Sequence, residues 1–330
     1  MDMREISSEA ASWVAANWIV YLFPVFALLM LVEWAATRRG GLAGAYEGAD
    51  TRANLLSGAG SFAIGAATKT ATIAGLCALY ELTPLRLPAD HWATWVIAIV
   101  VLDFCLYWAH RFSHETRLGW AIHVTHHSSE RYNLSVALRQ SWTLGLLACF
   151  FAPLPLLGVP IEVVLVVKAL SSAYQFWLHT EAIDRLPRWF ELVFNTPSHH
   201  RVHHGRNPRY LDKNYGGTFI VWDRAFGTFE PEVERPRYGL THALGGRGVL
   251  HINFHEWRDM LRDAWRARSW RERAGFVLRR PGWRPPARPA RVVASAGESG
   301  WLQACASTLA VGILGEECGA SSASLVAARE

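Results

Sequence analysis

Five long apolar stretches restrict the folds that this sequence can adopt. They cover residues 13–35, 54–82, 92–112, 134–157 and 160–180. Each is near or above the roughly 20 residues that a helix needs to cross the hydrocarbon of a membrane. Buried core helices of a soluble protein are the alternative, but five stretches of this length make that the minority interpretation. The sequence therefore predicts an all-α, polytopic membrane helical protein with about 4–5 spans.

Arginine positions predict the orientation of these spans. Arg38, Arg39 and Arg52 lie between the first two stretches, and several arginines follow the fifth, starting at Arg185. The turn APLPLLGVP between the fourth and fifth stretches holds no Lys or Arg, and its shortness also allows a re-entrant hairpin. Because cytoplasmic loops are enriched in basic residues, we expect the N-terminus outside and the long C-terminal region inside.

Composition narrows the class of protein. The formal net charge is +5, and most of the excess is arginine in the C-terminal half. Arginine beside apolar spans is typical of the cytoplasmic side of a membrane protein, so we expect no nucleic-acid partner. The five cysteines are scattered without a CxxC pair, so neither a disulfide framework nor a cysteine metal site is expected. The N-terminal segment lacks a basic start, which favours a retained span over a cleaved signal peptide.

Histidines are concentrated in three short clusters. The 14 histidines of the chain include HRFSH at 110–114, HVTHH at 123–127 and HHRVHH at 199–204. Spacings of three and four residues place side chains on one face of a helix, and neutral imidazole is a common ligand of transition metals. Because so many imidazoles exceed what one tetrahedral ion can use, the sequence predicts a dinuclear, histidine-rich site. In the predicted orientation, all clusters lie on the cytosolic face, as a helical cap.

Asp103 lies within the third apolar stretch, on the same helical stripe as His110. A buried carboxylate in a span needs a partner. It could orient a ligand imidazole or pair with an intramembrane lysine, and both interpretations stay open. No phosphate-binding loop and no strand-linked GxGxxG occurs, so any redox chemistry needs a separate electron donor.

These motifs together resemble the fatty acid hydroxylase superfamily, also called the sterol desaturase family. The stretches HHSSERYNLSVALRQS, YQFWLHTE and NTPSHHRVHHGRNPRYLDKNYGGTFIVWDRAFGTFEPE extend the resemblance to about 90–245. Within the superfamily, they are most similar to alkylglycerol monooxygenases. The resemblance implies a membrane-bound non-haem di-iron enzyme that uses O2, two Fe ions and an external reductant, either tetrahydrobiopterin or a redox protein, to hydroxylate a lipid.

The resemblance also implies the roles of individual residues. Glu115, Glu181 and His199 adjoin the histidine boxes and, like Asp103, could orient ligands without binding metal. The resemblance implies that nine histidines bind metal: His110, His114, His123, His126, His127, His179, His200, His203 and His204. All of them except His179 are also expected to be catalytic.

The chain divides into four predicted regions. Residues 1–90 hold N-terminal transmembrane helices, and 91–245 form the fatty acid hydroxylase-like di-iron domain. Within 246–284, residues 255–278 are expected to form an amphipathic helix at the membrane surface or, equally, one packed on the domain. Residues 285–330 are expected to be a disordered tail with a short helix at 301–314.

Three functions remain open from the sequence. The first is a lipid monooxygenase acting on a substrate such as an alkylglycerol ether, and the second is a sterol or fatty acyl desaturase or hydroxylase on the same scaffold. The third is a histidine-rich metal transporter, which the position of the histidines at span ends rather than at the midplane disfavours. The Ala-, Arg- and Gly-rich composition favours a bacterial source and the inner membrane, whereas a eukaryotic chain would lie in the endoplasmic reticulum.

Overall fold

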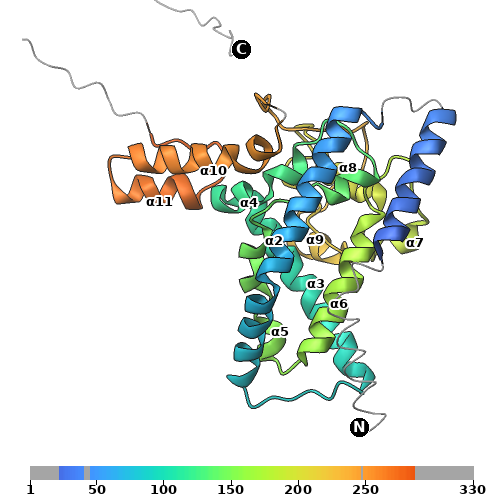
Figure 1. The fold of residues 1–330 in the computed structure, drawn as a ribbon, viewed down its shortest axis with the longest axis vertical. Helices are drawn as coiled ribbons and strands as arrows, with labels where there is room; N and C mark the ends of the chain where they lie inside the picture. Colours follow the sequence, from blue (N-terminus) through green and yellow to red (C-terminus); the bar gives the residue numbers. More distant parts are fainter. Residues whose placement is uncertain (1–21, 41–44, 247, 287–330) are drawn as a thin grey trace, which may run out of the picture. The chain divides into compact units, whose positions relative to one another are not determined.

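A computed structural model describes residues 22–40, 45–246 and 248–286 of the chain. The described residues are mostly helical, and their β-structure is limited to one isolated antiparallel bridge between Phe194 and Phe219. An unlabelled helix at 22–39 precedes the labelled helices of Figure 1. The α-helices are α2 (Gly48–Glu81), α3 (Trp92–Glu115), α4 (Arg117–His127), α5 (Pro153–Leu156), α6 (Ile161–Phe176), α7 (Arg188–Glu191), α8 (Pro197–His204), α9 (Val221–Phe226), α10 (Val249–Arg266) and α11 (Trp270–Leu278). Two 3₁₀ helices, η1 (Leu134–Leu138) and η2 (Leu144–Phe151), lie between α4 and α5.

Two of the described helices, α2 and α3, are long and apolar enough to cross a membrane. The most apolar window of α2 is only 6% buried inside the protein, against 39% for α3. Exposed side chains on α2 include Leu55, Leu56 and Phe62. Apolar surface of this extent is favoured next to hydrocarbon and disfavoured in water.

The region 134–157 differs from the single span that its hydropathy predicts. It is divided among η1, η2 and α5, because buried polar residues interrupt the apolar run at 139–141. The next helix, α6, has 16 residues, so neither region adds a helix of spanning length. The first predicted stretch, 13–35, lies partly outside the described residues. The predicted total of about 4–5 spans therefore remains a prediction.

The apolar core lies where α3 packs against α5 and α6. Its buried members include Leu102 of α3, Leu154 of α5 and Val163 of α6. A second, smaller cluster joins Phe26 of the helix at 22–39 to Phe176, whose ring stacks on it with centroids 4.0 Å apart. These contacts position α3, whose last turns carry His110 and His114, and α6, which precedes His179.

The predicted amphipathic helix at 255–278 is two helices, α10 and α11, separated by residues 267–269. Ser269 causes the break by capping α11, because its hydroxyl accepts a hydrogen bond from the backbone N–H of Glu272 at 3.2 Å. In Figure 1, α10 and α11 lie side by side and crosswise to α2. The C-terminal tail, 285–330, was predicted to be disordered with a short helix at 301–314. Almost all of these residues lie outside the described part of the chain.

Candidate metal centre

Four segments bring the predicted ligands to one end of α3. His110 and His114 lie in its last two turns, and α4 follows after Thr116 alone. Thr116 caps α4 by accepting a hydrogen bond from Gly119 N at 3.0 Å. A Cβ at Gly119 would lie 2.3 Å from the carbonyl oxygen of Phe112, so only glycine allows this close approach of the two helices. The remaining histidines come from α8 and from the segment after α6.

All nine predicted metal-binding histidines meet in the structure, in two groups. Within each group, one ring nitrogen per histidine lies within 4.8 Å of the corresponding nitrogen of every other member. The five-histidine group contains His110, His114, His123, His127 and His203. The four-histidine group contains His126, His179, His200 and His204. His127 of one group and His204 of the other stack at a centroid distance of 4.4 Å, so the two groups adjoin.

Backbone carbonyls set the tautomers of several imidazoles. In the four-histidine group, His126 Nδ1 lies 3.3 Å from Arg139 O, and His179 Nδ1 lies 3.0 Å from Gln175 O. A carbonyl can only accept, so each Nδ1 carries the proton and each Nε2 carries a lone pair. The same anchoring of Nδ1 leaves Nε2 available as the ligand atom in many metal sites.

The distances between these Nε2 atoms fit a bound cation. His126 Nε2 and His179 Nε2 are 3.2 Å apart, although both nitrogens carry lone pairs that would repel one another. Two ligands at right angles, each roughly 2.1 Å from one ion, would be about 3 Å apart. In the five-histidine group, His123 Nε2 lies 2.9 Å from His110 Nε2 and 3.1 Å from His127 Nε2. The donor set is nitrogen only, which suits borderline transition metals rather than Mg²⁺ or Ca²⁺.

Burial favours the neutral form of His127 and His204, which lie in different groups. Desolvation, followed by the proximity of His204 and His203, holds the pKa of His127 well below its ordinary value. Desolvation and the neighbouring His126 lower the pKa of His204 in the same way. Neutral imidazole is the form that binds metal, so the site is ready for a cation at physiological pH.

The loop 212–215 orients three members of the five-histidine group. Tyr215 O lies 2.8 Å from His110 Nδ1, and Lys213 O lies 2.9 Å from His203 Nδ1. The Asp212 carboxylate lies 3.8 Å from His114 Nδ1. The backbone of this loop is strained, since Asp212 and Asn214 have φ values of 59° and 55°. Asp and Asn tolerate this left-handed region better than other side chains, and such strain is concentrated at functional sites.

Two of the carboxylates expected to orient ligands have other partners. Asp103 accepts hydrogen bonds from Thr218 N at 2.6 Å, Phe219 N at 3.0 Å and Trp222 Nε1 at 3.0 Å. It therefore fixes the segment before α9 and neither orients an imidazole nor pairs with a lysine. Glu115 forms ion pairs with Arg111 at 3.1 Å and Arg280 at 3.6 Å. Carbonyl oxygens and Asp212 occupy the positions next to the histidines instead.

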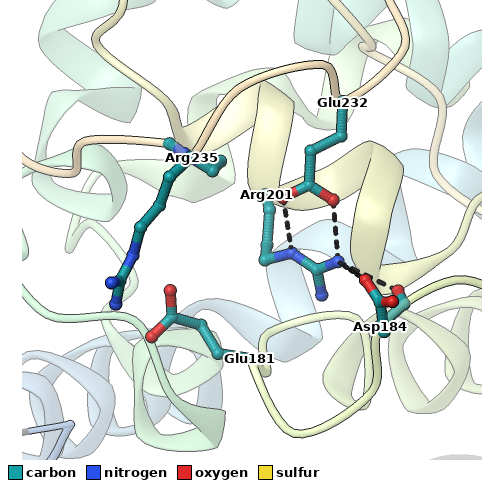
Figure 2. Close-up of a pocket in the computed structure, with 6 residues that line it drawn as sticks. Glu181, Asp184, Arg201, Glu232 and Arg235 are labelled. Carbon is teal, nitrogen blue, oxygen red and sulfur yellow. Dashed lines mark hydrogen bonds and ion pairs between the residues drawn. The ribbon is translucent and has the colours of Figure 1, made fainter.

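Glu181 faces a charged pocket beside the four-histidine group. Figure 2 shows the pocket, about 340 Å³ in volume, between Glu181, Arg235 and the Arg201–Glu232 pair. The Arg201 guanidinium contacts Glu232 at 2.7 Å and donates to the carbonyl of Thr180 at 3.1 Å. Because Arg201 lies on α8 between His200 and His203, this arginine ties α8 to the segment that carries His179.

His199 lies on α8 but not in either histidine group. Its ring packs edge-on against Phe229 at a centroid distance of 5.4 Å, and its Nδ1 is buried without a hydrogen-bond partner in the described chain. The neighbouring His200 does join the four-histidine group. Successive helical residues point about 100° apart, so these adjacent histidines have different surroundings and provide a matched pair for substitution.

Two tyrosines next to the histidines were not predicted. The Tyr215 hydroxyl is buried with no hydrogen-bond partner among the described residues, and its ring lies 5.3 Å from that of His114. Tyr132 covers the other group, with its ring 5.2 Å from His204 and its hydroxyl donating to Leu178 O at 3.1 Å. The signal for Tyr215 was its place within the family-like stretch, directly after the residues RYLDKN.

The family comparison identifies the segment that contains these histidines. Residues 95–228 match the family model described as fatty acid hydroxylase. Over these residues the chain is similar to the fatty acid hydroxylase family. The match includes most of α3 and all of α4, α6 and α8, and its range contains all nine histidines of the two groups. The family resemblance predicted from the sequence is thereby confirmed.

Curated relatives of the hydroxylase domain are enzymes named for lipids. The alkylglycerol monooxygenase of Danio rerio is 46% identical over 202 residues, which cover 61% of this chain and 45% of the relative. The human alkylglycerol monooxygenase is 45% identical over 204 residues, with the same two coverages. An ornithine lipid hydroxylase of Rhizobium tropici is 35% identical over 150 residues, covering 44% of this chain and 45% of the relative. The chain thus spans about half the length of these relatives. No solved structure matches the chain.

Proposed function

We propose that the protein is an integral membrane, non-haem di-iron monooxygenase that hydroxylates a C–H bond of a lipid with O2 and external electrons. The observation that carries this proposal is the convergence of nine imidazoles into two adjoining groups. The hydroxylase-family match and the relatives named as lipid monooxygenases or hydroxylases support it. The activity of the whole protein is part of the proposal because the chain covers only about half of those relatives.

Each histidine group would hold one ion. The four-histidine group offers four nitrogen donors, and the five-histidine group offers five. Bound reduced iron would supply the activation of O2 that attack on an unactivated C–H bond requires. The chain itself holds the imidazoles in fixed orientations, through the carbonyls of Arg139, Gln175, Lys213 and Tyr215. Such preorganisation is the protein's main contribution to cofactor chemistry.

The surroundings of the two groups suit a lipid substrate. Tyr132 packs on His204 and limits the access of water to the four-histidine group. Phe104 and Trp108 of α3, six and two residues before His110, form an exposed aromatic patch with Phe226 of α9. Tyr107 stacks on Phe226 and contacts the ring of Tyr215. An acyl or alkyl chain that reached the centre from the membrane would meet this patch first.

An alkylglycerol ether is the substrate to test first, because two of the reported relatives are named alkylglycerol monooxygenases. The reductant would be external, either tetrahydrobiopterin or a redox protein. A sterol or fatty acyl desaturase or hydroxylase on the same scaffold is the alternative within enzymes. We place the protein in a membrane as a multi-pass protein, in the inner membrane of a bacterium or the endoplasmic reticulum of a eukaryote.

The test combines metal content with product. The full chain is purified in detergent, its Fe and Zn are quantified, and it is given ¹⁸O2, a reductant and a panel of lipids that includes an alkylglycerol. The matched variants are His200→Gln and His199→Gln, adjacent on α8 but only one of them in a histidine group. We expect H200Q to lose metal and product, while H199Q retains both.

The outcomes separate the alternatives. An ¹⁸O-labelled hydroxyl in an alkylglycerol supports the proposal in full, whereas reaction of another lipid alone would retain the hydroxylase and reject this substrate. A double bond without incorporated oxygen would identify a desaturase. Metal flux into vesicles with no oxygenated or desaturated product would contradict an enzyme and favour a transporter.

A further inference from the structure

Helix α10 exposes an apolar stripe that its packing inside the protein does not use. The stripe consists of Leu250, Phe254, Leu261 and Trp265, which are 62%, 38%, 59% and 85% exposed. At 100° per residue, the four side chains fall within about 60° of one another around the helix. The buried side of α10, with Ile252, Asn253 and Met260, lies elsewhere on the helix. Exposed apolar residues aligned in this way indicate an interaction surface.

Helices α10 and α11 form a hairpin, and this hairpin, which bears the stripe, is strongly basic. Residues 248–286 contain nine arginines and four acidic residues, an excess equal to the formal net charge of +5 of the whole chain. Arg258 and Arg262 lie along one edge of the apolar stripe and are 62% and 46% exposed. Trp270, at the start of α11, is 72% exposed. Trp beside Arg, next to an apolar face, is typical of a helix that lies at the surface of an anionic membrane.

The hairpin lies at the level where α2 would enter the hydrocarbon. Asn253 of α10 accepts a hydrogen bond from Trp142 N at 3.0 Å, and the Trp142 indole donates to Ser57 O of α2 at 3.1 Å. Trp142 packs directly on Gly60, where a Cβ would lie 2.2 Å from the indole ring. From Gly60 to the end of α2 at Glu81, the helix rises about 31 Å at 1.5 Å per residue. This length equals the roughly 30 Å thickness of the hydrocarbon of a bilayer.

The hairpin is rigidly joined to a helix of the metal centre. The buried Arg117, at the start of α4, forms ion pairs with Glu256 at 2.7 Å and Asp263 at 2.9 Å on α10. Near the other end of α4, Thr125 Oγ1 donates to Ile252 O at 3.2 Å. Because α4 carries His123, His126 and His127, the position of α10 sets the position of these ligands.

We propose that α10 and α11 form an interfacial anchor that binds an anionic lipid surface through the apolar stripe and the arginines along its edge. The anchor lies crosswise to α2, as a helix in the membrane plane would (Figure 1). It holds the histidine groups at the level of the lipid headgroups, where an alkyl or acyl chain can reach them from the hydrocarbon. The binding of lipid by this surface does not depend on the proposed chemistry.

The test measures the depth of adjacent residues in the bilayer. The full chain, with its native cysteines replaced by alanine, receives a fluorescent label at Trp265→Cys or at the neighbouring Arg266→Cys and is reconstituted in nanodiscs. A third sample retains only Cys77, which is exposed on α2. The discs contain phosphatidylcholine alone or with phosphatidylglycerol, and the quencher is a nitroxide on the acyl chain or aqueous iodide.

We expect several-fold stronger nitroxide quenching at position 265 than at position 266, and the reverse order with iodide. Quenching at 265 should increase with phosphatidylglycerol, and the pair R258Q and R262Q should remove this increase. Equal iodide quenching at 265 and 266, with nitroxide quenching only at Cys77, would overturn the anchor. Nitroxide quenching at 265 that is independent of lipid charge would overturn the preference for anionic lipid. Absence of nitroxide quenching at Cys77 would overturn the membrane level on which the proposal depends. None of these readouts requires enzymatic activity.

Discussion

The two histidine groups differ in how they are enclosed and in what holds them. Every member of the four-histidine group is buried, and its anchoring carbonyls come from η1's C-terminal cap and from α6. The five-histidine group has two half-buried members, His110 and His123, and three of its imidazoles are oriented by one strained loop. Closed sites with four donors are typical of tightly held ions, whereas open sites are typical of catalysis. We therefore expect the four-histidine group to hold metal more tightly and the five-histidine group to be nearer the chemistry.

Removal of one ligand from each group gives the largest expected effects. His126→Ala leaves three donors in the four-histidine group and should abolish activity and remove about one ion per chain. His123→Ala leaves four donors in the other group, so it should abolish activity while more metal is retained. Metal analysis of both purified variants checks the difference. Equal metal loss in the two variants would remove the distinction between the groups.

Changes in the 212–215 loop should affect the five-histidine group selectively. Asn214 has a φ of 55° and donates hydrogen bonds to His199 O and Glu230 O. Asn214→Ala should lower activity by about 10–100-fold, as loss of ligand-orienting contacts commonly does. Asn214→Gly, which tolerates the backbone conformation, should retain more activity. Equal losses in the two variants, which both lack the amide, would show that the side-chain hydrogen bonds dominate over backbone strain.

Tyr215→Phe tests whether the unpartnered hydroxyl acts in the reaction. Because this hydroxyl is buried without a hydrogen-bond partner in the described chain, its removal should leave Tm unchanged or slightly raised. If the hydroxyl donates to a reacting oxygen, kcat should fall by about 100-fold while KM changes little. Steady-state kinetics and thermal unfolding separate the two effects. Unchanged kcat would assign the tyrosine to packing alone.

Acidification should release metal gradually. Burial lowers the pKa of His204 and His200 below their ordinary value of 6.5, so the unfolded chain binds more protons than the folded chain as pH falls. Folded-state stability is therefore present above about pH 6.5 and decreases below it, and protons also compete with metal for the imidazoles. Metal content measured after dialysis from pH 7.5 downward should remain constant above this value. Loss beginning well above it would indicate a titrating group outside the histidines.

The sequence predicted the components of the centre better than their supports. Spacings of three and four residues sufficed to place HRFSH and HVTHH on helix faces, because helical periodicity is local. The partners of Asp103, Thr218 and Phe219, could not be predicted because they are remote from it in the sequence. The loop 212–215 could not be singled out from its residue types. It acts mainly through backbone carbonyls, which every residue possesses.

The stretch 134–157 shows a second limit of sequence patterns. Its hydropathy resembled that of a span, but Arg139 is buried and donates hydrogen bonds to Thr125 O at 3.1 Å and Asn54 Oδ1 at 2.8 Å. These polar contacts anchor the region to α4 and α2 and divide the apolar run. By contrast, α2 and α3 are continuous helices that are long and apolar enough to cross a membrane, although α3 also carries the buried Asp103.

The most direct test of the account is the metal stoichiometry of the purified full chain, measured by mass spectrometry of the elements beside an amino-acid analysis of the same sample. If each histidine group holds one ion, the chain should contain about two Fe, and the H200Q variant about one. A chain that binds no transition metal, or a wild type and H200Q variant with identical metal content, would contradict the account.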